Sequence, residues 1–146
     1  MGRIKAVAAE LTEQFHTADP FAICEHLDIE ILWVDLPSSI KGFYSYFMDT
    51  RIIYLNSSLE DVQERRVVCA HELGHAMLHG KHNSLFLKET TDFVAARFEK
   101  EADLFAGYLL LDPQTVNDCR CNDWTYGQIS QFTGLSEEVV EYCLTN

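Results

Sequence analysis

The amino-acid sequence predicts one domain of the α+β class. Its 146 residues fit a single domain, since domains typically have about 100–200 residues. Hydrophobic residues make up 47% of the chain, which is enough to form a buried core. Runs of β-branched and aromatic residues lie between residues 29 and 55, and helical apolar periodicity dominates the rest. We therefore expect a small sheet and several helices, with a core in residues 1–113 and a helical cap in residues 114–146.

The N-terminal part is expected to contain two helices and three strands. Apolar side chains at spacings of three and four predict an amphipathic helix over residues 3–16. Asp19 followed by Pro20 is a typical helix start and predicts a short helix to about residue 27. The strands are expected at residues 29–34, 42–47 and 51–55, and the last two are expected to form a hairpin around residues 48–50.

Two long helices are predicted in the middle of the chain. The first covers about residues 59–80, and a capping box at Ser57 or Ser58 marks its start. The second covers about residues 91–111 and is stopped by Pro113. Shorter helices near residues 114–119, 126–133 and 136–144 complete the prediction.

The charge balance and the cysteines narrow the classes of function. Asp and Glu number 23 against 11 Lys and Arg, and the formal charge of −12 repels phosphate backbones and anionic membranes. The 5 cysteines are irregularly spaced, which favours a reducing compartment over a disulfide framework. The longest apolar run, at residues 104–111, is too short to span a membrane, and the N-terminus lacks the apolar core of a signal peptide. We expect a soluble cytoplasmic protein for which membranes and nucleic acid are disfavoured partners.

The motif His71-Glu72-Leu73-Gly74-His75 lies in the middle of the first long helix. Residues four apart on a helix project from one face, so His71 and His75 can bind the same metal ion while Glu72 lies beside it. The flanking residues are apolar, and buried imidazoles and carboxylates are costly unless they are ligated or hydrogen-bonded. The sequence therefore predicts a metal site here rather than a purely structural helix.

Two histidines do not complete a catalytic zinc site, which needs three protein ligands and an open position for water. The pattern H-E-x-x-H-x-x-G-x-x-H fails, because Leu78 stands at the glycine position and Lys81 at the third histidine position. The inverted motif H-x-x-E-H is also absent from the sequence. A glutamate from the second long helix remains, which would give a His₂Glu ligand set.

The second long helix offers Glu99 and Glu101 as the third ligand. Glu99 shares one edge of the apolar stripe with Asp103, which follows one turn later. Asp103 can accept a ring N–H from a ligating histidine, as carboxylates around metal sites commonly do. Glu101 projects from the other side and has Arg97, four residues earlier, as an expected partner. On this geometry, together with the resemblance described next, we favour Glu99 as the ligand and keep Glu101 as the alternative.

The second long helix carries the sequence EKEADLFA at residues 99–106 and ends in LLLDP at residues 109–113. Together with the first motif, these segments resemble the ImmA/IrrE family of metallopeptidases. The resemblance implies a zincin-like fold, a minimal gluzincin in which a sheet of three or more strands packs on two metal-bearing helices. It also implies that His71, His75 and Glu99 bind Zn²⁺ and that Glu72 is the catalytic base.

The resemblance further implies an intracellular zinc peptidase that regulates other proteins. Zinc with an open position lowers the pKa of bound water to about 7, and Glu72 would take that water's proton. The implied substrate is a basic helix-turn-helix repressor of a mobile element or stress response, which an acidic protease would attract electrostatically. We expect the substrate to lie extended along an exposed edge of the sheet formed by residues 51–55.

The alternative is a non-proteolytic regulator with a structural zinc site, in which the C-terminal helices bind a protein partner. Residues 128–140 have the pattern of a helix-turn-helix, but the second helix begins with Glu137 and Glu138, where DNA readers carry basic or amide side chains. DNA binding is therefore the less favoured form of this alternative. Retention of Glu72 favours the peptidase, because a structural site has no use for a base.

Several further side chains are not assigned to the metal site. His79 follows His75 by one turn, but the helix face has rotated by then, so we expect it to hydrogen-bond or pack. Cys119 and Cys121 form a single thiol pair and are expected to bind no metal. Three residues are candidates for stabilising an oxyanion, namely His79, Tyr108 and Tyr126. The sequence does not place any of them in the active-site cleft.

Overall fold

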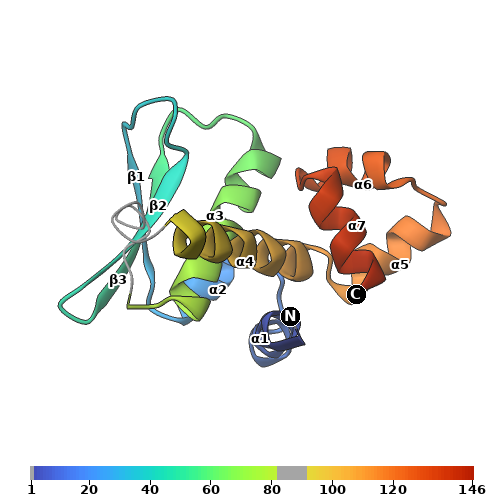
Figure 1. Cartoon of the computed structure of the whole chain (residues 1–146), viewed down its shortest axis with the longest axis horizontal. Helices are drawn as coiled ribbons and strands as arrows, with labels where there is room; N and C mark the ends of the chain where they lie inside the picture. The colour runs from blue at the N-terminus through green and yellow to red at the C-terminus, as the bar shows by residue number, and fades with distance from the viewer. Residues whose placement is uncertain (1, 82–91) are drawn as a thin grey trace.

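A computed structural model describes residues 2–81 and 92–146 of the chain. Within these residues it contains seven helices and a three-stranded sheet, which confirms the α+β prediction (Figure 1). In chain order the elements are α1 (Gly2–Phe15), α2 (Pro20–His26), β1 (Glu30–Val34), β2 (Gly42–Phe47), β3 (Thr50–Asn56), α3 (Val62–Leu78), α4 (Asp92–Leu110), α5 (Pro113–Cys121), α6 (Tyr126–Thr133) and α7 (Glu137–Thr145).

The sheet has the order β1-β3-β2, so β3 lies in its centre. β3 pairs in parallel with β1 and antiparallel with β2, and Ile53 is in register with Ile31 on one side and Tyr44 on the other. The predicted hairpin of β2 and β3 is confirmed. The prediction that residues 51–55 form an exposed edge is wrong, because the chain after β1 passes the end of β3 and places β2 on its far side. Among the strands in residues 2–81 and 92–146, the edge positions belong to β1 and β2.

Asn56, the last residue of β3, fixes the connection between β1 and β2. Its side-chain amide, which is buried, donates to the carbonyl oxygens of Leu36, Pro37 and Ile40 at 3.1, 3.3 and 3.0 Å. Its Oδ1 atom accepts from the backbone N–H and the hydroxyl of Ser58 at 3.0 and 2.8 Å. One buried amide therefore joins the two loops that lead into β2 and toward α3.

The start of α3 also differs from the prediction, because Asn56 engages the serine that was expected to cap the helix. Ser58 binds Asn56, and the capping box predicted at Ser57 or Ser58 is wrong. The N-cap is Asp61, whose side chain accepts from the backbone N–H of Gln63 at 3.0 Å. The helix therefore begins three residues later than predicted and ends at Leu78.

Helix α3 packs between the sheet and α4, and close approach makes this possible. A Cβ atom at Gly74 would lie 3.1 Å from the ring of Phe105 and 3.2 Å from the backbone of Ala102. The hydroxyl of Tyr44 donates to the carbonyl of Gly80 at 2.6 Å and ties the end of α3 to β2. The largest fully buried apolar side chains around these contacts are Ile4, Ile23, Tyr44, Ile53, Leu55, Leu73, Phe105, Leu109 and Val140.

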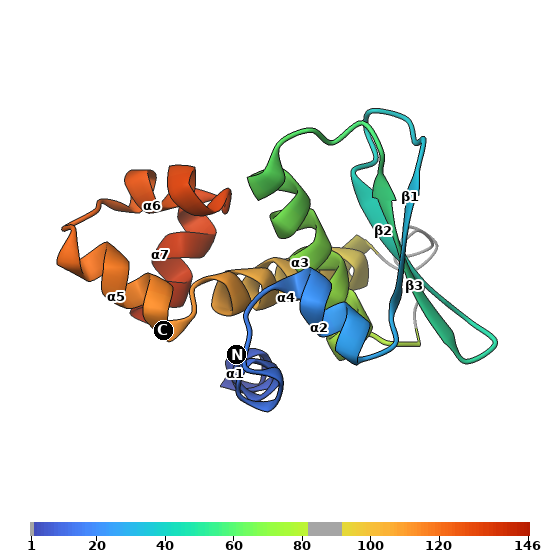
Figure 2. The ribbon, with the colours of Figure 1, turned by 180° about the vertical axis from the view of Figure 1, so that it is seen from behind.

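The three C-terminal helices lie at the end of α4 that is opposite to the sheet, as both ribbon views show (Figures 1 and 2). Their positions confirm the helices predicted in residues 114–146. α7 packs closely on α4, since a Cβ atom at Gly107 would lie 2.6 Å from Val139 and 2.7 Å from Cys143. Gly134, at φ +82°, closes α6 and approaches the side chain of Val67 on α3. Among the described helices, none is both long and apolar enough to cross a membrane.

Candidate metal centre

The structure brings the three predicted ligands together across the α3–α4 contact. The side-chain ligand atoms of His71, His75 and Glu99 all lie within 4.8 Å of one another. The Nε2 atom of His71 is 3.0 Å from Glu99 Oε2, and the Nε2 atom of His75 is 2.9 Å from Glu99 Oε1. The two imidazoles project from successive turns of one helix, as their spacing predicts. In the part of the chain that the structure describes, this is the one group of three such residues that could hold a metal ion.

Asp103 lies where the sequence predicts it. Its Oδ1 atom is 2.8 Å from His71 Nδ1, on the ring edge away from Glu99. A carboxylate only accepts hydrogen bonds, so His71 carries a hydrogen on Nδ1 and directs Nε2 toward Glu99. This is the arrangement in which an outer carboxylate orients a metal-binding histidine.

The surroundings of His75 contain His79, which the sequence leaves outside the metal site, and Glu101, which the sequence keeps as the alternative third ligand. His75 Nδ1 lies 3.1 Å from His79 Nδ1, and His79 Nε2 lies 2.8 Å from Glu101 Oε1. The expectation that His79 forms hydrogen bonds is confirmed. The expected pairing of Glu101 with Arg97 is wrong, because α4 turns Glu101 toward the end of α3. The i+4 spacing of His75 and His79 could have predicted the contact between these two rings. The contact between His79 and Glu101 depends on how α3 and α4 pack.

The Nε2 atom of His75 shows that a metal ion fits this residue set. The side chain is 1% exposed, and among the described residues Nε2 has no hydrogen bond of good geometry despite its 2.9 Å distance to Glu99. A buried ring nitrogen without a hydrogen bond costs free energy unless another interaction compensates for it. Two imidazole nitrogens and a carboxylate oxygen facing one another are ligands that zinc prefers.

The electrostatics of the cluster favour positive charge. Burial alone would lower the pKa of His71, but its hydrogen bonds to Asp103 and Glu99 and the nearby Glu72 carboxylate outweigh burial and raise the pKa to about 10. Burial would likewise raise the pKa of Glu99, yet its contacts with His71 and His75 hold it well below the usual range. Carboxylates that stabilise a proton here will also stabilise a divalent cation in its place.

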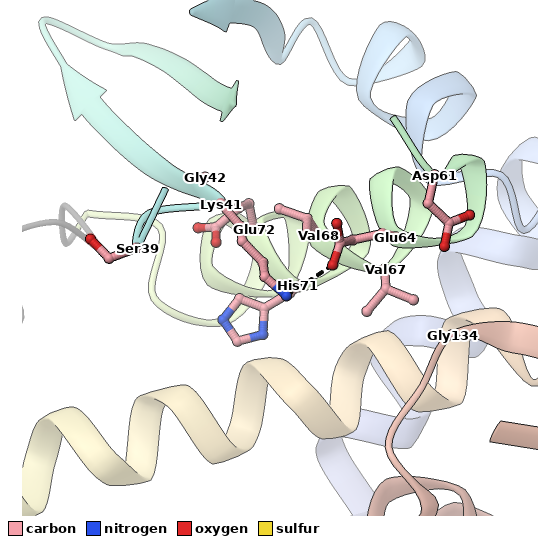
Figure 3. A pocket seen from close by; sticks show the side chains of 10 residues that line it. All are labelled: Ser39, Lys41, Gly42, Asp61, Glu64, Val67, Val68, His71, Glu72 and Gly134. Atoms are coloured by element: carbon pink, nitrogen blue, oxygen red, sulfur yellow. Dashed lines mark hydrogen bonds and ion pairs between the residues drawn. The ribbon is translucent and has the colours of Figure 1, made fainter. Parts of the chain in front are cut away.

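A cavity of about 430 Å³ adjoins the centre and reaches both His71 and Glu72 (Figure 3). Figure 3 shows it bounded by α3, by the segment before β2 and, on the opposite side, by Gly134. Glu72 is 6% exposed and lies in its wall, beside the histidine that the sequence pairs with it. An ion pair of 2.9 Å between Lys41 and Glu64 lies along the same wall. The cavity gives a substrate access to His71 and Glu72 together.

The other candidate residues lie elsewhere. Tyr108 lines a different cavity, between α1 and the C-terminal helices, and Tyr126 lies at the start of α6. Cys119 is buried in α5 and Cys121 is exposed at its end, and neither belongs to a group of described residues that could hold a metal ion. Neither tyrosine lines the cavity that reaches Glu72.

Two histidines one helical turn apart, a glutamate from a second helix and a buried glutamate in the adjoining cavity are the residue set of a metallopeptidase of the zincin class. Comparison with known proteins agrees with this class. Residues 24–145 match the peptidase family model described as the IrrE N-terminal-like domain. The chain therefore belongs to the ImmA/IrrE family of metallopeptidases, as its motifs predict.

Two relatives illustrate the similarity. An uncharacterized immunity region protein 2 of Bacillus phage phi105 is 35% identical over 136 residues, covering 93% of this chain and 85% of the relative. Metallopeptidase ImmA of Bacillus subtilis (strain 168) is 27% identical over 146 residues, covering 97% of this chain and 84% of the relative. Both similarities extend over nearly the whole chain, and the family model reaches residue 145, in the last helix.

Proposed function

We propose that this protein is a zinc-dependent endopeptidase that cleaves a basic helix-turn-helix repressor. One observation carries the proposal: His71, His75 and Glu99 face one another, and Glu72 lies in the wall of the cavity that reaches them. The activity belongs to the cytoplasm, where the five cysteines, none of them in a disulfide, stay reduced.

The proposed metal is zinc, and its proposed ligands are His71, His75 and Glu99. Imidazole and carboxylate donors suit zinc, and three protein ligands leave a position open for chemistry. When bound, the metal supplies Lewis-acid catalysis, polarising a peptide carbonyl and lowering the pKa of water. Asp103 supports this role by holding the Nδ1 hydrogen of His71, so that Nε2 is available.

Glu72 is the proposed general base. Its carboxylate takes a proton from the attacking water and later gives that proton to the nitrogen of the leaving amine. Its burial in the wall of the cavity supports this role, because exclusion of bulk water strengthens the electrostatic effect of a nearby charge.

The proposed substrate segment is extended and lies against β2. Since β3 is central, a peptide cannot pair with it, whereas among the strands that the structure describes β2 pairs on one side only. β2 begins at Gly42, which lines the cavity beside His71 and Glu72. An extended peptide added to a sheet edge binds through main-chain hydrogen bonds, so this route tolerates varied side chains.

Two observations support a repressor as the substrate. One relative is named as an immunity region protein and belongs to a phage, which is a mobile element, and another is named Metallopeptidase ImmA. The net charge of −12 would attract a basic DNA-binding protein and accelerate encounter at low salt. The same charge disfavours DNA as the direct partner.

The test is cleavage of a purified basic helix-turn-helix repressor by the zinc-loaded protein and by Glu72→Gln. We expect Glu72→Gln to retain zinc and to lose activity by about 10²- to 10⁴-fold, because only the proton transfer is removed. Glu60→Gln, the same change at an exposed residue outside the cavity, is the matched control. Equal cleavage by the wild type, Glu72→Gln and chelator-treated samples would overturn the mechanism. Repressor binding without any cleavage would favour the non-proteolytic alternative.

A further inference from the structure

His75, His79 and Glu101 form a buried line of polar side chains that leads away from the metal centre. The ring nitrogens His75 Nδ1 and His79 Nδ1 are 3.1 Å apart, and His79 Nε2 is 2.8 Å from Glu101 Oε1. The side chains of His75 and His79 are 1% and 3% exposed, and that of Glu101 is 23% exposed. Both ring nitrogens of His79 are therefore engaged in the protein interior.

Phe98 fixes the orientation of His79 from the side. The two rings are stacked with centroids 3.9 Å apart and an interplanar angle of 15°. Phe98 and Glu101 are three residues apart on α4, so they share one face of that helix and meet His79 together. Helix α4 thus supplies both the ring that stacks on the His79 imidazole, Phe98, and the acceptor for His79 Nε2, Glu101.

The line of contacts determines which nitrogen of each ring carries hydrogen. The Glu101 carboxylate only accepts, so His79 holds its hydrogen on Nε2 and a neutral His79 presents a lone pair at Nδ1. His75 must then donate from Nδ1, and a neutral His75, the form that binds metal, therefore has its lone pair on Nε2, the atom that faces Glu99. This is the tautomer that a metal ion requires of His75.

We propose that His79 and Glu101 are positioning residues that hold His75 in its metal-binding tautomer and orientation. The inference rests on the proposed zinc centre and assigns a role to two residues outside the ligand set. Without an acceptor at His79 Nδ1, nothing would hold the hydrogen of His75 on Nδ1. The ring would then also populate the tautomer with hydrogen on Nε2, which cannot bind metal.

The test is zinc affinity, measured by competition with a chelator of known affinity. His79→Phe keeps a ring to stack on Phe98 and removes both nitrogens. Loss of a partner that orients a metal-binding histidine typically lowers metal affinity by about 10- to 100-fold, and we expect a loss in that range. His26→Phe is the matched control, since His26 is also stacked on a phenylalanine, with ring centroids 4.9 Å apart, and lies outside the cluster. It should leave the zinc affinity unchanged.

Two further measurements separate positioning from packing. Glu101→Leu should weaken zinc binding, whereas Glu101→Gln, whose carbonyl can accept the same hydrogen bond, should retain most of the affinity. Long-range ¹H–¹⁵N spectra of the metal-free protein should show His75 with hydrogen on Nδ1 in the wild type and a mixture of tautomers in His79→Phe.

The outcomes separate this inference from the proposed function. If the wild type binds one zinc ion and both His79→Phe and Glu101→Leu bind it equally well, the positioning role is wrong and the zinc centre stands. If the wild type binds no zinc, both are wrong. If His79→Phe does not fold, the comparison of Glu101→Leu with Glu101→Gln decides, and equal affinities in those two variants would overturn the positioning role.

Discussion

The two histidines of the centre belong to one helix and one motif, yet the structure supports them in different ways. His71 has a single outer acceptor, Asp103, whose side chain is 56% exposed. His75 is supported by His79 and Glu101, of which the first is 3% and the second 23% exposed. We call these the exposed arm, which is His71 with Asp103, and the buried arm, which is His75 with His79 and Glu101.

Because the two arms differ in burial, we expect them to contribute differently to the free energy of metal binding. A hydrogen bond at a solvent-exposed carboxylate competes with water and is screened, so its removal costs little. A buried imidazole that loses its partner retains an unsatisfied group and pays the full desolvation cost. The buried arm should therefore set the affinity and rigidity of the centre. In the exposed arm, His71 lines the cavity through which we propose that a substrate enters.

The largest effect is expected where the arms meet, at Glu99. Its two oxygens contact His71 and His75 separately, so Glu99→Gln removes the charge that both histidines share. Loss of a residue that only orients a metal-binding histidine typically lowers metal affinity by about 10- to 100-fold. Glu99 is itself a proposed ligand, so Glu99→Gln should lower zinc affinity by more than that. Chelator competition measures this, with Glu141→Gln on the exposed face of α7 as the control. Unchanged affinity in Glu99→Gln would mean that another carboxylate is the third ligand.

The exposed arm could be predicted from the sequence because it depends on single-helix periodicity. Four residues separate His71 from His75 and Glu99 from Asp103, so each pair lies along one helix face whatever the packing. If the two long helices meet at His71, the shared helix face places both Glu99 and Asp103 beside that histidine. The proposed ligand set and its exposed support therefore follow from helix periodicity together with the family resemblance, without knowledge of the sheet or of the C-terminal helices.

The buried arm and the loop beside the cavity could not be predicted in this way. Glu101 has an acceptable partner on its own helix in Arg97, and only the crossing of α3 over α4 turns it toward His79 instead. Likewise, Ser57 and Ser58 read as a helix start, but Ser58 binds Asn56, and the strand order places Asn56 where three carbonyls of another loop converge. Both errors concern groups whose partners lie far away in the sequence.

The stability of the metal-free protein should depend on pH through His71 of the exposed arm. In the metal-free protein the pKa of His71 is raised from 6.5 to about 10. The protonated form therefore contributes stability that is fully present below pH 6.5 and is lost as pH rises toward 10. Screening at the half-exposed partners limits this to on the order of 1 kcal/mol, or about 2–4 °C in Tm.

Thermal unfolding in chelator between pH 6 and pH 10 measures this contribution. Asp103→Asn removes one of the contacts that raise the pKa, so its Tm should depend less on pH than that of the wild type. Zinc must displace the same proton, and binding at pH 8 should therefore release close to one proton in the wild type. Identical pH profiles of Tm for the two proteins would show that the Asp103 contact does not hold the proton.

The smallest effect is expected for zinc binding by Asp103→Asn. The asparagine carbonyl can still accept from His71 Nδ1, and water can reach the site, so affinity should fall by only about 2- to 5-fold. This loss should be smaller than that of His79→Phe, because Asp103 is half exposed and His79 is buried. Because the two residues act on different histidines, the double variant should show losses that add within about 0.5 kcal/mol. A larger loss in Asp103→Asn than in His79→Phe would reverse the roles of the two arms, and strong coupling in the double variant would show that they act as one network.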